Sequence, residues 1–325
     1  GMAGAAAYRP SQVALVRTLA AGLPGSALDR AAAVASGKLQ PETAAQAGRE
    51  EAIRTLELAA ELARYRYLAK DTPKESYLAV YLPILRVRST LGALPEPPRV
   101  QEPPAPEQGH LSGKGTLFVG NRGGNGFAEL RWRPAYHHLL DPVAGYVPGS
   151  QIVFLETAAR LTEREGARLR EVSVVDIVSL APRDRFFSPV SWKVRFGLYR
   201  RMLADHREHP VGLVNTGVGM AWETAAGIAY AMLETEVAAG TGYEHGASAA
   251  VGVSGGVTGE LGRWSYLLTG ESFLKSDAGT QPAWRVAKRN SFSVDRRNAL
   301  TLDFSLERSY GKQVGEFSLG WSRYF

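Results

Sequence analysis

The sequence contains no cysteine among its 325 residues. Thiolate nucleophiles, zinc–thiolate sites and disulfides are therefore excluded from this chain. It also lacks any run of eighteen apolar residues, which excludes a membrane-spanning helix on length. A spanning β-barrel remains compatible with this lack, because its strands alternate apolar and polar residues and never look hydrophobic overall.

A dense block of charge of one sign is missing as well. The formal net charge is only +6, and basic pairs such as Arg131/Arg133 and Arg296/Arg297 are spread along the chain. This distribution indicates solvated or lumen-lining charge, so we expect no nucleic-acid partner. No secretion signal is visible at the start, and Gly1 before Met2 is typical of a tag remnant, so we expect a longer natural precursor.

Residues 1–92 have the periodicity of helices. Pro41 is predicted to open a long helix whose apolar stripe recurs at three- and four-residue steps, at Ile53, Leu56, Ala60, Ala63 and Tyr67. A second helix is predicted from Pro73, with Pro83 expected to kink it. We interpret this region as a small helical segment whose stripe serves packing.

Residues 93–109 have a different composition. Six prolines lie between Leu94 and Pro106. Such a segment is typical of an extended, semi-rigid spacer, so it predicts a linker between two domains.

From residue 110 to residue 325 the pattern becomes period-two, with breaks at Gly, Pro, Asn or Asp. Twelve strands are predicted, near 111–120, 126–134, 151–161, 168–180, 191–201, 211–222, 226–238, 247–257, 261–272, 283–293, 298–308 and 314–325. A soluble β-sandwich or lipocalin-like barrel would also alternate. The polar faces suit a wet lumen and no helices follow residue 110 to cover a soluble sheet, which favours a transmembrane-type antiparallel β-barrel, mainly β in class.

The last ten residues strengthen this interpretation. Phe317, Leu319, Trp321 and Phe325 fall on one face of an extended chain. This ending resembles the closing strand of bacterial outer-membrane β-barrels, which the barrel assembly machinery reads. The resemblance implies a Gram-negative outer-membrane location, with outer-membrane lipid and that machinery as partners.

An even number of strands places both ends of a barrel on the same side, which in outer-membrane barrels is the periplasm. The long connections 135–150 and 181–190 would then face the periplasm together with the helical segment. We expect these turns to form a docking platform that contains Asp141, Tyr146, Arg183, Asp184 and Arg185.

Two stretches near these turns carry a family resemblance, namely residues 129–142 with 145–152 and residues 175–180 with Arg183-Asp184. They resemble the C-terminal half of a proteobacterial envelope family related to the Lnb-type lipoprotein N-acyltransferases. The resemblance implies a papain-like Cys/His catalytic domain in the periplasm ahead of a barrel. This chain has no cysteine, so it corresponds to the helical connector and the barrel, with the catalytic domain absent.

Candidate sites within the chain are few. His110 and Ser112 lie two residues apart and would share a strand face, as a His-activated serine requires, although no acidic partner is identifiable. His137 and His138 are adjacent and would point in opposite directions on an extended chain, so we expect no metal site, and no cofactor is predicted.

Three functions follow from these patterns. The leading hypothesis is a non-catalytic barrel that anchors or orients a periplasmic Cys/His catalytic domain or partner acting on acylated envelope substrates. A barrel lipid hydrolase or acyltransferase that uses His110 and Ser112 is one alternative, and a pore or channel is another.

Overall fold

The computed structural model describes residues 10–94, 96, 100, 102, 105, 109–278 and 282–325. The chain forms two compact units, residues 1–103 and residues 104–325. Most of the linker predicted at 93–109 lies outside the described residues, as does the start of the chain.

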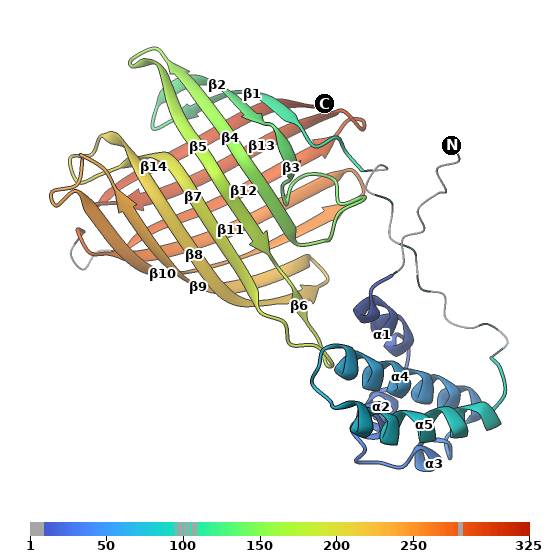
Figure 1. Ribbon diagram of the computed structural model, residues 1–325. Coiled ribbons are helices and arrows are strands. Elements are labelled where there is room, and N and C mark those ends of the chain that lie inside the picture. The colour runs from blue at the N-terminus through green and yellow to red at the C-terminus, as the bar shows by residue number, and fades with distance from the viewer. Residues whose placement is uncertain are drawn as a thin grey trace, which may run out of the picture. The chain divides into compact units, whose positions relative to one another are not determined.

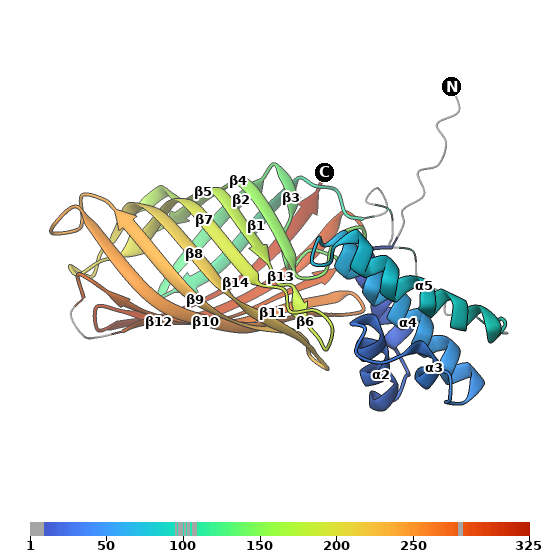
Figure 2. The ribbon, with the colours of Figure 1, turned by 60° about the horizontal axis from the view of Figure 1, so that its bottom comes forward.

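The first unit is helical (Figure 2). Its helices are α1 (Gln12–Ala20), α2 (Gly25–Ala35), α3 (Pro41–Ala44), α4 (Arg49–Leu68) and α5 (Lys74–Thr90). The prediction that one long helix begins at Pro41 is wrong, since a four-residue helix comes first and α4 starts only after Gly48. Glycine at this boundary weakens helix continuation, which separates the two segments.

Helix α4 provides the centre of the helical unit. Of the predicted stripe residues, Ile53, Leu56, Ala60 and Ala63 are buried and Tyr67 is partly exposed, so the stripe is confirmed except at its last position. Helix α5 instead leaves a ridge of leucines at Leu78, Leu82 and Leu85 between 36% and 52% exposed. No helix in the described part of the chain has the length and hydropathy needed to cross a membrane.

The second unit is a closed antiparallel β-barrel (Figure 1). Among the described residues, twelve strands form its wall: β1 (Lys114–Arg122), β2 (Asn125–Arg133), β4 (Ser150–Thr162), β5 (Gly166–Ser179), β7 (Ser191–Met202), β8 (Glu208–Thr224), β9 (Gly227–Ala239), β10 (Ala247–Leu261), β11 (Trp264–Lys275), β12 (Ala283–Ser293), β13 (Asn298–Ser309) and β14 (Lys312–Tyr324). Each pairs with the next, and β1 closes the ring by pairing with β14 as well as with β2. The predicted barrel is confirmed.

Two short strands are not counted among the twelve wall strands. Strand β3 (Ala135–His137) continues the edge of β2 along β4, and β6 (Pro182–Arg183) pairs in parallel with β8. Both belong to the long connections predicted at 135–150 and 181–190. The structure therefore uses these connections as ordered parts of the barrel end.

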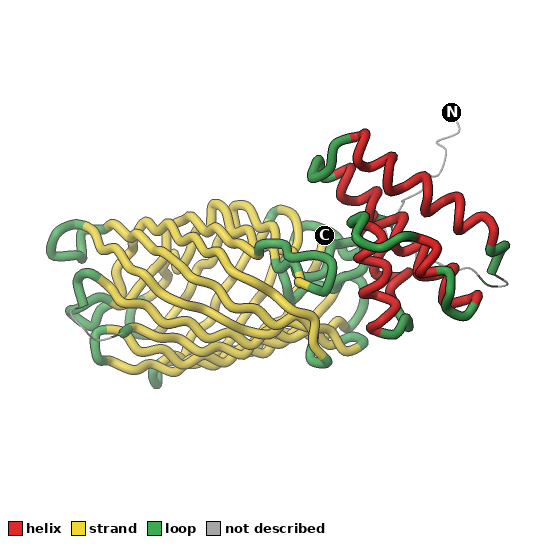
Figure 3. The backbone as a smooth tube through the Cα atoms, turned by 90° about the horizontal axis from the view of Figure 1, so that it is seen from below, coloured by secondary structure: helices red, strands yellow, loops and turns green. Residues whose placement is uncertain are grey.

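The two ends of the barrel differ in their connections (Figure 3). We call the end at which β1 begins and β14 finishes the terminal rim, and the opposite end the distal rim. Both long connections, 134–149 and 180–190, lie at the terminal rim, whereas the β1–β2 and β13–β14 turns at the distal rim span only two residues each. The even strand number explains why β1 begins and β14 finishes at the same rim, but it does not set the lengths of the connections.

Exposed tryptophans gather at one height of the barrel wall. Of the six in the sequence, five lie at the terminal-rim ends of their strands with 42% to 47% of the side chain exposed: Trp132, Trp192, Trp222, Trp264 and Trp321. Phe196, Phe304, Phe317, Leu319 and Phe325 are exposed on the same outer surface. A soluble barrel would bury such residues, whereas a membrane barrel turns apolar side chains to lipid and places tryptophan at the interface.

We predict a large cost for a charge on the outer wall. Val253 is 52% exposed near the middle of β10, and Val253→Arg should destabilise the barrel in lipid vesicles by about 2–4 kcal/mol, because the guanidinium would lie in hydrocarbon. Urea unfolding in vesicles measures this. Val147→Arg is the matched control, since Val147 is 71% exposed in a rim connection and should change stability by less than about 0.5 kcal/mol. Equal effects at both positions would contradict the lipid-facing wall.

Candidate functional site in the barrel lumen

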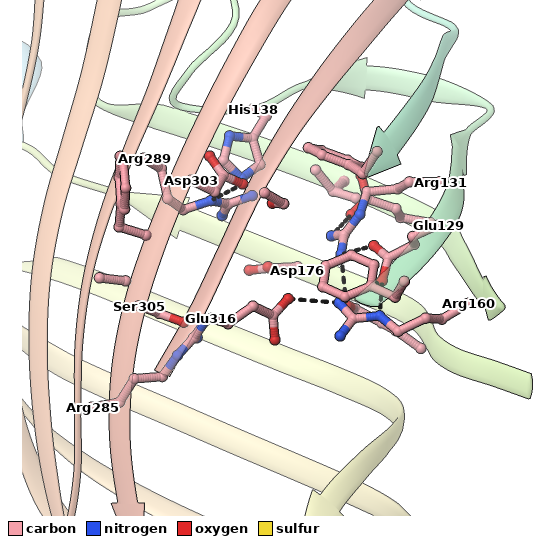
Figure 4. Close-up of a pocket in the computed structure, with 18 of the residues that line it drawn as sticks. Glu129, Arg131, His138, Arg160, Asp176, Arg285, Arg289, Asp303, Ser305 and Glu316 are labelled. Atoms are coloured by element: carbon pink, nitrogen blue, oxygen red, sulfur yellow. Dashed lines mark hydrogen bonds and ion pairs between the residues drawn. The ribbon is translucent and has the colours of Figure 1, made fainter. Parts of the chain in front are cut away.

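The lumen is occupied by a continuous chain of ion pairs. Glu129 lies 3.0 Å from Arg131 and 2.8 Å from Arg160, and Arg160 lies 2.6 Å from Glu316 (Figure 4). Arg131 also contacts Glu156, at 3.0 Å. Side chains of opposite charge from β2, β4 and β14 therefore neutralise one another inside the barrel. Such buried charges are stable only when paired, so the network fixes the positions of these side chains.

One ion pair crosses the lumen near the distal rim. Arg122 on β1 reaches Glu208 at the start of β8, 3.0 Å away, and also contacts Glu316 and Glu307. In the ring of twelve described strands, four strands separate β1 from β8 one way round and six the other. The contact therefore joins nearly opposite walls, which blocks a wide passage at this level.

An apolar cluster adds to the obstruction at the distal end. It consists of buried side chains from the strand interiors and from the neighbouring turns: Tyr199, Leu203, Val211, Leu213, Ala238 and Tyr243. Tyr310 packs against it and donates a hydrogen bond to Asp277, 2.6 Å away. Apolar side chains that face a lumen are sheltered from water only if they pack together, so this cluster favours a closed distal end.

The terminal end is crossed by the connection 138–149. The backbone N–H of Val143 donates to a carboxylate oxygen of Glu260 on β10, at 3.1 Å. This connection precedes β4, and among the described strands four lie between β4 and β10 one way round the ring and six the other. The loop therefore extends from one wall to the far wall across the barrel mouth.

Asp141 holds this loop in place. Its fully buried carboxylate accepts hydrogen bonds from Tyr324, Lys114 and the backbone N–H of His138, at 2.8–2.9 Å, and pairs with Arg133 at 2.6 Å. Burial raises the pKa of Asp141, but the charges of Arg133 and Lys114 outweigh it and hold the pKa well below its usual range. Asp141 was expected on an exposed docking surface, yet its place is inside the mouth, where it cannot touch a partner directly.

Two histidines lie beside this carboxylate. His110 Nε2 and His137 Nδ1 are 2.9 Å apart, and the ring of Tyr146 stacks on both imidazoles. Burial lowers the pKa of His110 more than the nearby Asp141 raises it. Nitrogen and oxygen atoms of His110, His137 and Asp141 lie within 4.8 Å of one another, as metal ligands would. However, Lys114 and Arg133 already neutralise the carboxylate, and their positive charges disfavour an added cation.

The other predicted site residues are placed as follows. Both ring nitrogens of His110 are engaged, with Leu111 O at 2.7 Å and with His137, while Ser112 is exposed, so the structure does not bring His110 and Ser112 together as a catalytic pair. Arg183 lies in β6, and Asp184 and Arg185 are exposed beyond it. His138 points away from His137 and lines the lumen cavity, as expected for adjacent histidines.

That cavity measures about 160 Å³ and lies between the ion-pair network and β12. Arg195, Arg285, Arg289 and Asp176 contribute to its walls. The sequence analysis did not single out these four residues, because no local signal indicates which acid meets which base. The network was therefore not predicted.

Residues 103–324 match the family described as Domain of unknown function (DUF7840). The chain belongs to this family. Residues 6–100 match a second family, Domain of unknown function (DUF7842), so the boundary between the two matches falls in the proline-rich segment that precedes the DUF7840 barrel. A search of curated proteins finds no match.

Several solved structures resemble the DUF7840 barrel. A NanC porin structure is 11% identical, with 65% of this chain and 100% of that chain covered and a TM-score of 0.40. An anion-selective porin from Comamonas acidovorans is 10% identical, with 66% and 98% covered and a TM-score of 0.32. The Acinetobacter baumannii outer membrane protein Omp33 is 11% identical, with 66% and 99% covered and a TM-score of 0.33. At these scores the likenesses add nothing to the barrel that the strand pairing itself establishes.

The buried position of Asp141 leads to a mutational prediction. Asp141→Asn should destabilise the barrel by about 3–5 kcal/mol, because Lys114 and Arg133 would keep their charges without a counterion. Urea unfolding in vesicles measures the change. Glu165→Gln, which breaks an exposed turn pair with Arg168, should cost less than about 1 kcal/mol and serves as the control. A loss below 1 kcal/mol for Asp141→Asn would show that the carboxylate does not hold the mouth together.

Stability should also fall on mild acidification. Burial lowers the pKa of both His110 and His138. Below about pH 6.5 these two histidines therefore bind more protons in the unfolded chain than in the folded chain. The stabilisation is complete above about pH 6.5 and declines as the pH falls, by up to about 1.4 kcal/mol per group and pH unit. Urea midpoints between pH 8 and pH 5 measure the slope, and His110→Gln should reduce it. A midpoint that does not change with pH would contradict the prediction.

Proposed function

We propose that this chain is an outer-membrane anchor and not an open pore. The observation that carries the proposal is the obstruction of the lumen at three levels. Connection 138–149 reaches Glu260 across the terminal mouth, the Glu129–Arg131–Arg160–Glu316 network fills the middle, and Arg122 joins Glu208 near the distal rim. A barrel built in this way holds a position in the membrane without offering a wide aqueous passage.

The same proposal places the terminal rim and the helical unit in the periplasm. Support comes from the even number of strands, which brings both ends of the barrel to the terminal rim. The long connections at this rim invert the usual pattern of short periplasmic turns, and the tryptophans mark a membrane interface without identifying its side. The linker then tethers the helical unit close to the membrane. Tethering raises the effective concentration of anything the helical unit binds near the lipid surface.

The proposed partner is a periplasmic Cys/His catalytic domain that acts on acylated envelope substrates. Its class follows from the resemblance to the Lnb-type lipoprotein N-acyltransferase relatives, since this chain has no cysteine of its own. The exposed ridge of Leu78, Leu82 and Leu85 on α5 supports a binding role, because a solvated helix gains nothing from an apolar row of this kind.

Conductance decides between the anchor and the pore alternative. The purified full-length chain, incorporated in planar lipid bilayers, should give no stable unitary current steps, because Arg122 and Glu208 bridge opposite walls. A porin incorporated under the same conditions is the positive control. Reproducible current steps from the wild-type chain would instead support the channel reading.

Co-purification tests the partner. The full-length chain should retain a periplasmic protein that contains a Cys/His catalytic domain, and the double variant Leu78→Glu with Leu82→Glu should lose it, because two carboxylates would interrupt the apolar ridge. Thr43→Glu, at an exposed position of α3, is the matched control and should retain the partner. If the double variant captured the same protein as the wild type, the ridge would have no role in docking.

A further inference from the structure

A second, larger cavity lies at the terminal mouth. It measures about 480 Å³, within the range of small-molecule sites, and has a mainly apolar wall. The loop 138–149 contributes Val143, Ala144 and Pro148, and the facing strand ends contribute Ile228, Thr258 and Ser265. The cavity is thus shaped by the same loop that crosses the mouth.

His137 provides a fixed hydrogen-bond acceptor in this wall. His110 Nδ1–H donates to Leu111 O at 2.7 Å, which leaves His110 Nε2 to accept from His137 Nδ1–H at 2.9 Å. The neutral His137 ring then carries its lone pair on Nε2, and the His137 side chain lines the cavity. Tyr146 stacks on the ring at 4.2 Å and 8°, so the imidazole is held in orientation.

The charges around the cavity restrict the class of ligand. Among the described residues no lysine or arginine lines it, because Lys114 and Arg133 are held by Asp141. Its one carboxylate, Glu260, is engaged by the backbone N–H of Val143. An anion would find no counterion there and would be repelled by the Glu260 carboxylate, whereas the mainly apolar wall favours an uncharged chain. A neutral molecule suits this environment best.

We propose that the terminal-mouth cavity binds a neutral amphiphile, with an aliphatic chain against Val143, Pro148 and Ile228 and a hydroxyl or amide N–H donating to His137 Nε2. This site goes beyond the anchoring role and does not depend on it. A donor group is required because the acceptor is preformed, and a ligand that displaced water from the cavity without donating would leave that acceptor unpaired.

The experiment uses full-length chain in lipid nanodiscs with ¹⁵N-labelled histidine and 1-decanol as the probe. The chain has six histidines, so its imidazole spectrum is sparse, and His137→Gln identifies the His137 signal. Decanol should shift the His137 Nε2 resonance saturably. Decyl methyl ether has the same chain and an oxygen but no donor, and should bind at least about fivefold more weakly at equal mole fraction in the lipid.

Matched variants locate the site. Val143→Trp fills the cavity from the loop and should abolish the shift, whereas Val147→Trp, exposed in the same loop, should preserve it. Ile228→Trp fills the cavity from β9 and gives an independent second test should one variant fail to fold. The proposal is overturned if decanol gives no saturable shift in the wild type, if the shift persists in the filled variants, or if decyl methyl ether or decanoate binds as tightly as decanol.

Discussion

Closure of the backbone hydrogen-bond ring is the constraint on which the rest of the barrel depends. In hydrocarbon no water can satisfy a free N–H or C=O, so a sheet that spans lipid cannot keep an open edge. Strand β1 removes the last edge by pairing along its whole length with both β2 and β14. Once the ring is closed, every strand has one face toward lipid and one toward the lumen, which sorts Trp192 and Phe304 outward and Glu129 and Arg131 inward.

The sorting of residues explains why the lumen is filled. Charged side chains that face inward are largely removed from bulk water. The free energy lost by this desolvation is offset only when the side chains pair with one another. Closure brings Arg122 within 3.0 Å of Glu208 although 86 residues separate them, and the terminal loop uses Asp141 and Glu260 in the same way. Interior ion pairs thus brace the barrel across its diameter.

Sequence patterns predicted the strands of the barrel wall better than the side-chain contacts in the lumen and at the mouth. All twelve wall strands were located by alternation and by the turn residues between them, and the outward positions of Phe317, Leu319, Trp321 and Phe325 followed from the same period. The helix start at Pro41 was wrong because Gly48 interrupts the pattern. Asp141 was expected in a docking platform because it lies in a long connection, and only its contacts with Arg133, Lys114, Tyr324 and the backbone of His138 explain its buried position.

The sequence by itself therefore determined the strand number, the residues on the outer face and the common rim at which the barrel begins and finishes. These properties depend on local backbone geometry, since alternation has a period of two and every turn reverses direction. Only the tertiary structure decided that His110 meets His137 and not Ser112, that Arg122 meets Glu208, and that a cavity remains beneath residues 138–149. Those contacts depend on the curvature of the closed ring and on the path of one loop across it. The alternation of residues within a single strand determines neither of them.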